Sequence, residues 1–454
     1  MTDQPAIEDP STEGGVRSDY HVWHPFSQMG RLDREPQLII DRAEGNVLIA
    51  QDGSEYIDGV ASMWAIVHGH GHPHIVEAIQ QQAGKLQHST LLGIAHQPVI
   101  DLADRLVEIL PPGLEHVFFS ENGASAIEVA LKMAIQFWAN EGQPKRQRIV
   151  AMDDAYHGDT IGAVSVGGAG PFRDVYAPLL FEPLRFPNPY HYRSTDCKDG
   201  DHCTCVEKLG EVLAAHDDEV AAVIIEPRVQ GAGGMIVAPE GHIASIRRIC
   251  DEYDVLLIAD EVATGFGKTG AMFACDLEGV VPDITVLGKG MTGGYLPLSA
   301  TITSDRIYQA FYDATDESKK LFHGHTYAGN PICCAAALAN LDVFESEDVL
   351  GRVRDRADFL AAQLSERLGD HALVGEIRQQ GLMVGIELVA DRDTKQPLPR
   401  EMMAGWNVSL AARDRGVLVR PLGDTIVMMP PLSIETQQLE QMCEAVAYGL
   451  DTIV

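Results

Sequence analysis

The sequence predicts an α/β protein with one large domain built on a mostly parallel sheet and a smaller α+β domain. Short apolar runs alternate with helical periodicities from about residue 98 to residue 330, which is typical of parallel strands covered by helices. Beyond residue 330, amphipathic helices and scattered short strands replace this alternation. The length of 454 residues also exceeds what one typical domain holds.

These patterns divide the chain into four parts. Residues 1–19 are polar and acidic, and we expect them to be disordered. Residues 20–70 are expected to pack with the small domain, residues 71–330 to form the large domain and residues 331–454 the small one. The chain shows neither a basic segment followed by an apolar core at its start nor a run of about 18 apolar residues. We therefore expect a cytoplasmic protein with reduced thiols.

The charge of the chain excludes two classes of partner. Asp and Glu number 66 against 34 Lys and Arg, which gives a formal net charge of −32. Nucleic acids and anionic membranes both attract basic surfaces. We expect neither as a partner. The 45% of hydrophobic residues is sufficient for a large core.

Local patterns predict the elements near the N-terminus. Residues 21–29 mix aromatic and polar side chains and are expected to lie across a surface. Residues 37–60 alternate and contain two turn sequences, which predicts a β-meander. Four histidines between residues 68 and 74 are separated by glycine and proline, with no acidic or cysteine ligand beside them. They favour a turn into a helix over 74–87 rather than a metal site.

The remaining elements follow from apolar runs and helical periodicity. In the large domain, strands are predicted at 117–120, 148–151, 220–226, 255–260 and 284–288, with helices at 99–110, 124–140 and 240–252. In the small domain, helices are predicted at 333–339, 349–367, 400–414 and 435–450, with strands at 382–388, 416–420 and 425–429.

A stretch over residues 186–207 stands out within the large domain. It is rich in Pro, Tyr and His and then contains Cys197, Cys203 and Cys205. The spacing C-x5-C-x-C matches no standard set of zinc ligands. We predict a surface insertion loop and no metal.

The most informative stretch is Asp283–Gly294, where an apolar run ends in Lys289 set among glycines. The preceding apolar run ends in Asp260. Pyridoxal 5'-phosphate (PLP) requires a lysine amine that forms a Schiff base with it and an acid that pairs with its pyridine nitrogen. Alone, such a lysine also fits an ordinary loop. Together, the two residues predict a PLP site at the carboxyl edge of the sheet.

Three more segments lie at ends of predicted strands. Gly123 and Ala124 follow a strand and open a helix, whose free backbone N–H groups suit a phosphate. Tyr156 follows another strand, where its ring can stack on a flat cofactor. Glu226 ends a third strand. Each feature also fits a simple turn or a packed loop, so they are informative only together.

In this order, the segments resemble the class III aminotransferases of PLP fold type I, over about residues 20–450. The resemblance implies that fold and a PLP-dependent transfer of amino groups between small molecules. The segments that carry it are Gly123-Ala124, Tyr156-His157-Gly158, Glu226, Asp260-Glu261-Val262, Lys289 and His325-Thr326-Tyr327-Ala328-Gly329-Asn330-Pro331.

The same resemblance implies roles for the cofactor residues. Lys289 is expected to hold the cofactor and to carry the proton, and Asp260 to pair with the pyridine nitrogen. Tyr156 and Val262 are expected to cover the two faces of the ring. The other implied contacts are Gly123, Ala124, His157, Glu226 and, from the partner in a homodimer with shared active sites, Thr326.

Within the family, the chain resembles the branch that aminates 8-amino-7-oxononanoate to 7,8-diaminononanoate in biotin biosynthesis. The similarity lies in segments 21–26, 156–167, 229–235 and 420–423. It implies that Arg420 binds the substrate carboxylate, which suits a guanidinium fork. The other implied substrate-binding residues are Phe26, Met63, Trp64 and Gly324.

Three departures from this branch leave the substrates open. Many members have Tyr at Phe26, Trp at Met63 and Arg at Lys268. The first two changes resemble enzymes that take the amino group from lysine instead of S-adenosylmethionine, and a lysine at 268 cannot bind a carboxylate in a bidentate manner. The alternatives are a broad ω-amino acid or amine:pyruvate transaminase, another PLP reaction and, in a different class, a non-catalytic α/β binding protein.

Overall fold

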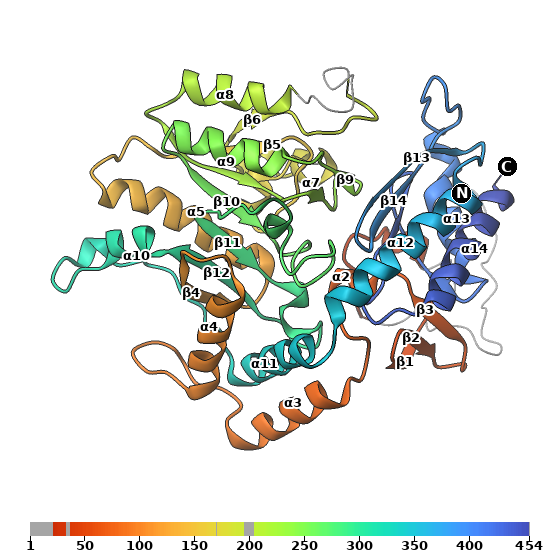
Figure 1. Ribbon diagram of the computed structural model, residues 1–454, viewed down its shortest axis with the longest axis horizontal. Helices are drawn as coiled ribbons and strands as arrows, with labels where there is room; N and C mark the ends of the chain where they lie inside the picture. The colour runs from red at the N-terminus through yellow and green to blue at the C-terminus, as the bar shows by residue number, and fades with distance from the viewer. Residues whose placement is uncertain (1–20, 33–36, 169, 195–203, 454) are drawn as a thin grey trace, which may run out of the picture.

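The computed structural model describes residues 21–32, 37–168, 170–194 and 204–453, and its central element is a seven-stranded sheet (Figure 1). Strand β12 runs antiparallel to its two neighbours, and the other six strands are parallel to one another. The predicted α/β fold with a mostly parallel sheet is confirmed. In spatial order the strands are β4 (Leu114–Ser120), β12 (Ser299–Ser304), β11 (Ile284–Leu287), β10 (Leu256–Asp260), β7 (Val220–Ile225), β5 (Arg148–Met152) and β6 (Leu184–Phe186).

Helices cover both faces of this sheet because consecutive strand residues point to opposite faces. Ile224 packs into the apolar cluster that includes α5 (Gly123–Asn140). Its neighbour Val223 packs into the cluster on the other face, with α8 (Cys205–Ala215) and α9 (His242–Glu252). The sheet is therefore buried on both faces, and this packing fixes the carboxyl ends of its strands in place.

The C-terminal residues build a second, antiparallel sheet with its own apolar core. Figure 1 shows it on the right, with its helices outside. The strands are, in order, β13 (Val374–Gln380), β14 (Met383–Leu388), β17 (Thr425–Met428) and β16 (Arg420–Leu422). The helices are α12 (Val349–Leu368), α13 (Ala404–Arg413) and α14 (Thr436–Thr452).

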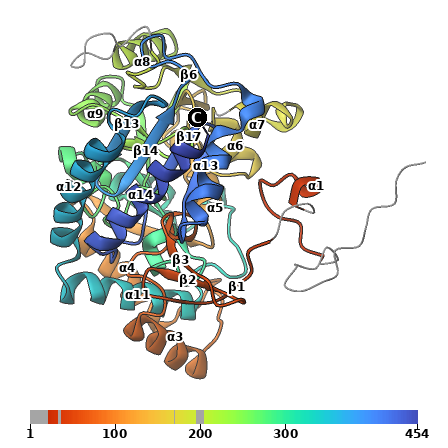
Figure 2. The ribbon, with the colours of Figure 1, turned by 90° about the vertical axis from the view of Figure 1, so that its right-hand side faces the viewer.

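The predicted β-meander consists of β1 (Ile40–Glu44), β2 (Val47–Ala50) and β3 (Glu55–Asp58). Strand β15 (Val417–Leu418) adds to it, parallel to β3, so the meander shares a sheet with a strand from the C-terminal part. Figure 2 shows β1, β2 and β3 below helices α13 and α14 of the C-terminal part. Helix α11 (Pro331–Ser346) lies against helices α3 (Pro73–Lys85) and α4 (Gln97–Ile109) beside the large sheet instead of against the C-terminal sheet.

The four histidines between residues 68 and 74 do not converge on one point. As predicted, they lie at a turn into a helix, α3 (Pro73–Lys85), of which His74 is the second residue. Each side chain has a different partner: His68 Nε2 lies 3.3 Å from Asn340 O, His70 Nε2 2.9 Å from Asp58 Oδ2, His72 Nε2 3.7 Å from Glu347 Oε1 and His74 Nε2 3.1 Å from Asp342 Oδ2.

Several expectations concern the cysteines, the ends of the chain and membranes. Cys205 is disulfide-bonded, so the expectation of reduced thiols is wrong at this position. Cys197, Cys203 and the tail over 1–19 lie outside the described residues. None of the helices in the described part combines the length and apolar character that a membrane crossing requires. Among the described residues, the free thiols are Cys250, Cys275, Cys333, Cys334 and Cys443.

Candidate active site

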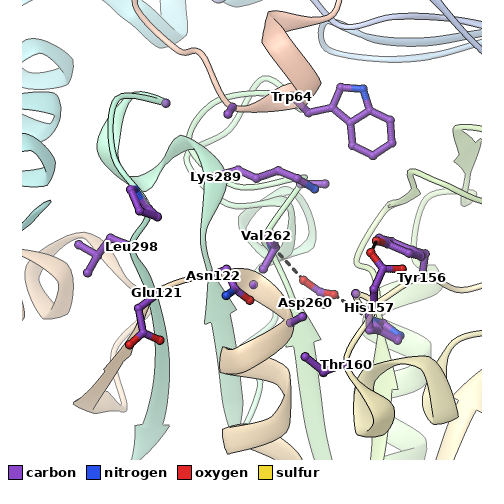
Figure 3. Close-up of a pocket in the computed structure, with 18 of the residues that line it drawn as sticks. Trp64, Glu121, Asn122, Tyr156, His157, Thr160, Asp260, Val262, Lys289 and Leu298 are labelled. Atoms are coloured by element: carbon purple, nitrogen blue, oxygen red, sulfur yellow. Dashed lines mark hydrogen bonds and ion pairs between the residues drawn. The ribbon is translucent and has the colours of Figure 1, made fainter. Parts of the chain in front are cut away.

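A cavity of about 730 Å³ opens at the carboxyl ends of the parallel strands. Figure 3 shows Trp64 and Lys289 on one side of it and Asp260, His157 and Tyr156 on the other. The cavity brings together nine of the residues predicted from the sequence. They are Trp64, Gly123, Ala124, Tyr156, His157, Glu226, Asp260, Val262 and Lys289.

Lys289 stands at the exit of β11 in a conformation that is unusual for its residue type. Its φ angle is +39°, in the left-handed region that favours glycine. Such local strain is concentrated at functional sites. Burial lowers the pKa of the amine, although the charges of Asp260 and Glu226 oppose this effect. The amine is therefore more often neutral, and hence nucleophilic, than that of a surface lysine.

Asp260 ends β10 and is only 5% exposed. Its Oδ1 accepts a hydrogen bond from the backbone N–H of Val262 at 3.0 Å, and its Oδ2 lies 2.7 Å from Nδ1 of His157. The other ring nitrogen of His157, Nε2, is buried and has no partner among the described residues. Two directed contacts thus fix the carboxylate at the edge of the sheet.

Glu226 holds the loop that carries Tyr156. Its carboxylate accepts hydrogen bonds from the backbone N–H groups of Tyr156 and Gly231, both at 2.9 Å. Burial raises the pKa of Glu226 to about 7, with Asp260 adding to the rise. The Tyr156 hydroxyl donates to Asp159 at 2.7 Å. The tyrosine is thus fixed at both its backbone and its side chain.

The N-terminus of α5 forms a close-fitting seat for an anion. The Asn122 side chain accepts from the Ser125 N–H at 3.0 Å, which leaves the preceding amides of the first turn without a helical partner. A Cβ on Gly123 would approach Val262 Cγ1 to 2.8 Å, and one on Gly158 would approach Ala124 Cβ to 2.4 Å. Only glycine fits at these two positions.

These groups match the chemistry of PLP. Helix amides suit its phosphate, a buried carboxylate suits its pyridinium, and a lysine of lowered pKa suits its aldehyde. All three groups line one cavity.

Five predicted residues do not line this cavity. Phe26 and Met63 are 57% and 39% exposed, and Thr326 and Gly324 are exposed as well. Arg420 lies half-buried in β16. Within a single chain, these residues are therefore not assembled with Lys289.

Lys268, which stands where many members of the branch have arginine, is not among the residues that line the cavity. Its side chain is 1% exposed, and Nζ donates to the carbonyl of Ile66 at 2.7 Å. Burial lowers the pKa of its amine to about 7. Lys268 thus belongs to the framework behind the site.

Other lining residues were not predicted from the sequence. Three of them, Asn122, Asp159 and Thr160, are close in sequence to predicted residues. The prediction therefore identified their segments but not these side chains. The segment 294–298 enters the cavity just before β12. Because β12 was not predicted, this segment had no assigned place.

Glu261 provides a test of the burial behind the site. It follows Asp260 but accepts hydrogen bonds from the Ala274 and Cys275 amides at 3.0 and 2.9 Å. Burial raises its pKa to about 7 from a usual 4.5, so the folded state binds this proton more tightly than the unfolded chain. Protonated Glu261 therefore contributes its full stabilisation at pH values below its pKa in the unfolded chain. This stabilisation is lost as the pH rises through its pKa in the folded protein.

We expect Glu261→Gln, which cannot titrate, to lower the melting temperature more at about pH 5 than at about pH 8. Calorimetry of the PLP-free protein at both pH values measures this difference. Glu141→Gln, at an exposed position, serves as the control. Equal losses at the two pH values would contradict the prediction.

Comparison with known proteins extends over nearly the whole chain. The family profile Aminotransferase class-III matches residues 29–450. An adenosylmethionine-8-amino-7-oxononanoate aminotransferase of Nitratidesulfovibrio vulgaris is 51% identical over 94% of this chain and 79% of the relative. A relative of the same name from Geobacter sulfurreducens is 47% identical over 95% of this chain and 96% of its own.

Solved structures agree with this similarity. The adenosylmethionine-8-amino-7-oxononanoate aminotransferase of Methanocaldococcus jannaschii has a TM-score of 0.91 at 42% identity and covers 96% of this chain and 97% of its own. A PLP-bound amine transaminase from an uncultivated Pseudomonas species has a TM-score of 0.92 at 38% identity, covering 96% of this chain and 99% of its own. The chain belongs to the class III aminotransferases, which are PLP-dependent enzymes.

Proposed function

We propose that this aminotransferase transfers an amino group to 8-amino-7-oxononanoate and produces 7,8-diaminononanoate, a step of biotin biosynthesis. The observation that carries the reaction type is the Lys289 amine in one cavity with the buried Asp260 carboxylate. The acceptor is supported by the names of relatives that share about half of the residues over nearly the whole chain.

In this proposal each residue has a defined task. PLP, when bound, withdraws electrons from the carbon that carries the amino group. The Lys289 amine would hold the cofactor and, once the donor amine has displaced it, would take the proton from the donor carbon and deliver it to the cofactor. Asp260 supplies the negative charge at the pyridine nitrogen, and His157 keeps that carboxylate oriented through their 2.7 Å contact. The amides of Gly123 and Ala124 bind the phosphate.

We propose that the protein acts as a cytoplasmic homodimer with shared sites. Thr326 and Gly324 are exposed and lie outside the cavity of their own chain. Large apolar side chains near them are also exposed, with Phe322 at 71% and Tyr327 at 60%. Burial of this surface against a second copy would place Thr326 near the partner's phosphate seat. A mass in solution equal to one chain contradicts this arrangement.

Half-reactions test the acceptor and identify the donor. The PLP-loaded protein is mixed separately with lysine, S-adenosylmethionine and a simple ω-amine, and the cofactor absorbance is followed. The aminated protein is then mixed with 8-amino-7-oxononanoate or pyruvate. Reaction with the first keto acid supports the proposal, and its absence with a reaction towards pyruvate rejects it.

A broad amine transaminase is the second candidate. It is favoured by the fold and 38% identity shared with the amine transaminase from Pseudomonas, and by Met63 where a flat aromatic wall is expected. A preference for the simple amine and pyruvate in the same experiment identifies this function. Family membership opposes the non-catalytic alternative.

Arg420 is the proposed anchor for the substrate carboxylate. Its guanidinium is half-buried, burial lowers its pKa, and no carboxylate pairs with it among the described residues. We expect Arg420→Met to raise the KM for 8-amino-7-oxononanoate by about 10- to 100-fold, the worth of a charge-assisted pair. Steady-state kinetics measures this effect.

Two comparisons sharpen the test of Arg420. The half-reaction with a simple amine, which has no carboxylate, should remain unchanged in the variant. Arg248→Met, at a surface position, should leave both reactions unchanged. An unaltered KM for the keto acid in the Arg420 variant rules out the assignment.

A further inference from the structure

The segment before Trp64 is strained. Ala61, Ser62, Met63 and Trp64 have φ angles of +48°, +45°, +75° and +68°. Four successive non-glycine residues thus adopt the left-handed conformation, which L-amino acids usually avoid. A turn of this kind persists only where its surroundings enforce it.

Asp58 enforces the turn from its N-terminal side. The side chain is 1% exposed and accepts hydrogen bonds from the N–H of Ser62 at 2.9 Å and from its hydroxyl at 2.7 Å. His70 Nε2 lies 2.9 Å from the same carboxylate. Burial alone would raise the pKa of Asp58, but the hydrogen bonds from His70 and Ser62 outweigh it and the pKa is lowered. The carboxylate therefore stays charged and holds the turn.

Lys268 holds the chain just after Trp64. Its Nζ donates to the carbonyl of Ile66 at 2.7 Å, from a fully buried position near the charge of Asp58. The backbone is also closely packed here, because a Cβ on Gly294 would approach the carbonyl carbon of Ala65 to 2.7 Å. Asp58 and Lys268 thus fix the backbone two residues before and two residues after Trp64.

The indole of Trp64 depends on this backbone for its orientation. The side chain is 6% exposed, and its buried Nε1 has no hydrogen-bond partner among the described residues. The indole packs closely against Gly231. Beyond such packing, the direction of the indole is set by the turn. The Lys289 Nζ lies 4.9 Å from the centre of the indole ring, within the range of a cation–π contact (Figure 3).

We propose that Asp58 and Lys268 are positioning residues for the active site. By holding the left-handed turn over 61–64 in place, they keep the Trp64 indole over the Lys289 amine. The alternative is a purely structural role, in which the two residues stabilise the fold and nothing more. The two roles differ in their coupling to Trp64: positioning acts through the indole, whereas a structural role is independent of it.

A double-mutant cycle distinguishes these roles. We expect Asp58→Asn to lower kcat for amino-group transfer by at least about 10-fold, with a smaller change in the KM of the donor, because misplacement of reacting groups acts mainly on kcat. In the Trp64→Phe background, the same substitution should lower kcat by less than about 2-fold. Lys268→Met should show the same coupling. Equal effects in both backgrounds overturn the proposal.

Fluorescence gives a readout that does not depend on activity. In the PLP-free protein, the Trp64 component is the difference between the emission of the wild type and that of Trp64→Phe. We expect Asp58→Asn to increase the quenching of this component by acrylamide, because the indole loses its fixed place. Ser62→Ala, which removes only the side-chain bond to Asp58, should have a smaller effect and serves if Asp58→Asn does not fold. Unchanged quenching in both variants contradicts the proposal.

Asp52→Asn is the matched control. Asp52 is exposed and accepts from the Ser54 N–H at 2.9 Å, a similar serine contact in the meander away from the cavity. It should change neither kcat nor quenching. The kinetic part rests on the proposed function only in requiring some amino donor. If the acceptor is not 8-amino-7-oxononanoate, the double-mutant cycle can still be measured with another acceptor. The quenching experiment requires no substrate.

Discussion

Lys289→Ala is expected to lower kcat/KM for amino-group transfer by at least about 10⁴-fold, because one side chain provides both covalent attachment of the cofactor and proton transfer. Its amine is buried at the exit of β11, and it is the one lysine among the described residues that line the cavity. Steady-state assays measure the loss. Borohydride reduction followed by mass spectrometry should show PLP fixed to the wild type at residue 289 and not to the variant.

Lys145→Ala is a suitable control because this lysine is largely exposed and its ion pair with Asp218 is on the surface. We expect it to keep wild-type kinetics and PLP attachment. Covalent attachment of PLP to the Lys289 variant would show that another residue binds the cofactor covalently. A loss of kcat/KM of less than about 10-fold would show that another group acts as the base.

Asp260→Asn is expected to lower kcat by about 10²- to 10⁴-fold. The carboxylate is nearly fully buried and is held by the Val262 amide and His157. An asparagine of the same shape cannot carry the charge that keeps a pyridine nitrogen protonated. Preorganised charges of this kind account for large parts of enzymatic rates. The measurement is the single-turnover rate with the preferred donor.

The binding of PLP separates an electronic effect of this substitution from a structural one. If Asp260 acts through its charge, the variant should retain covalent attachment at Lys289 while the turnover falls. Asp254→Asn, which alters an exposed pair with Arg306, should change neither property. A variant of Asp260 that keeps more than about one tenth of the wild-type rate would remove this residue from the proposed mechanism.

The parts of the fold that the sequence predicted are those with unbroken apolar runs or a clear helical or alternating period. The run 220–226 corresponds to β7, which is buried along its whole length, and the periodicity over 124–140 corresponds to α5. Strand β12 was missed because four of its six residues are serine or threonine, although it lies inside the sheet. Strand β13 was missed because it is largely polar. Their place depends on neighbouring strands, which local patterns do not contain.

The residues of the candidate site could be predicted from the sequence where they lie at the ends of predicted strands. Asp260, Lys289 and Glu226 directly follow apolar runs, so their position at one edge could be inferred. The contact of Lys268 could not be inferred, because about 200 residues separate it from its acceptor Ile66 in the sequence. The domain boundaries stay a prediction.

The antiparallel direction of β12 has a consequence for redesigning the substrate pocket. Because β12 runs opposite to β11, the chain leaves the sheet at Lys289 and re-enters it at residue 299 on the same edge. The lysine and the wall segment 294–298 thus lie on one short tether. A library that inserts or deletes residues in this tether would displace the lysine together with the wall. Point substitutions at lining residues leave the length of this tether unchanged and are therefore the safer way to enlarge the pocket.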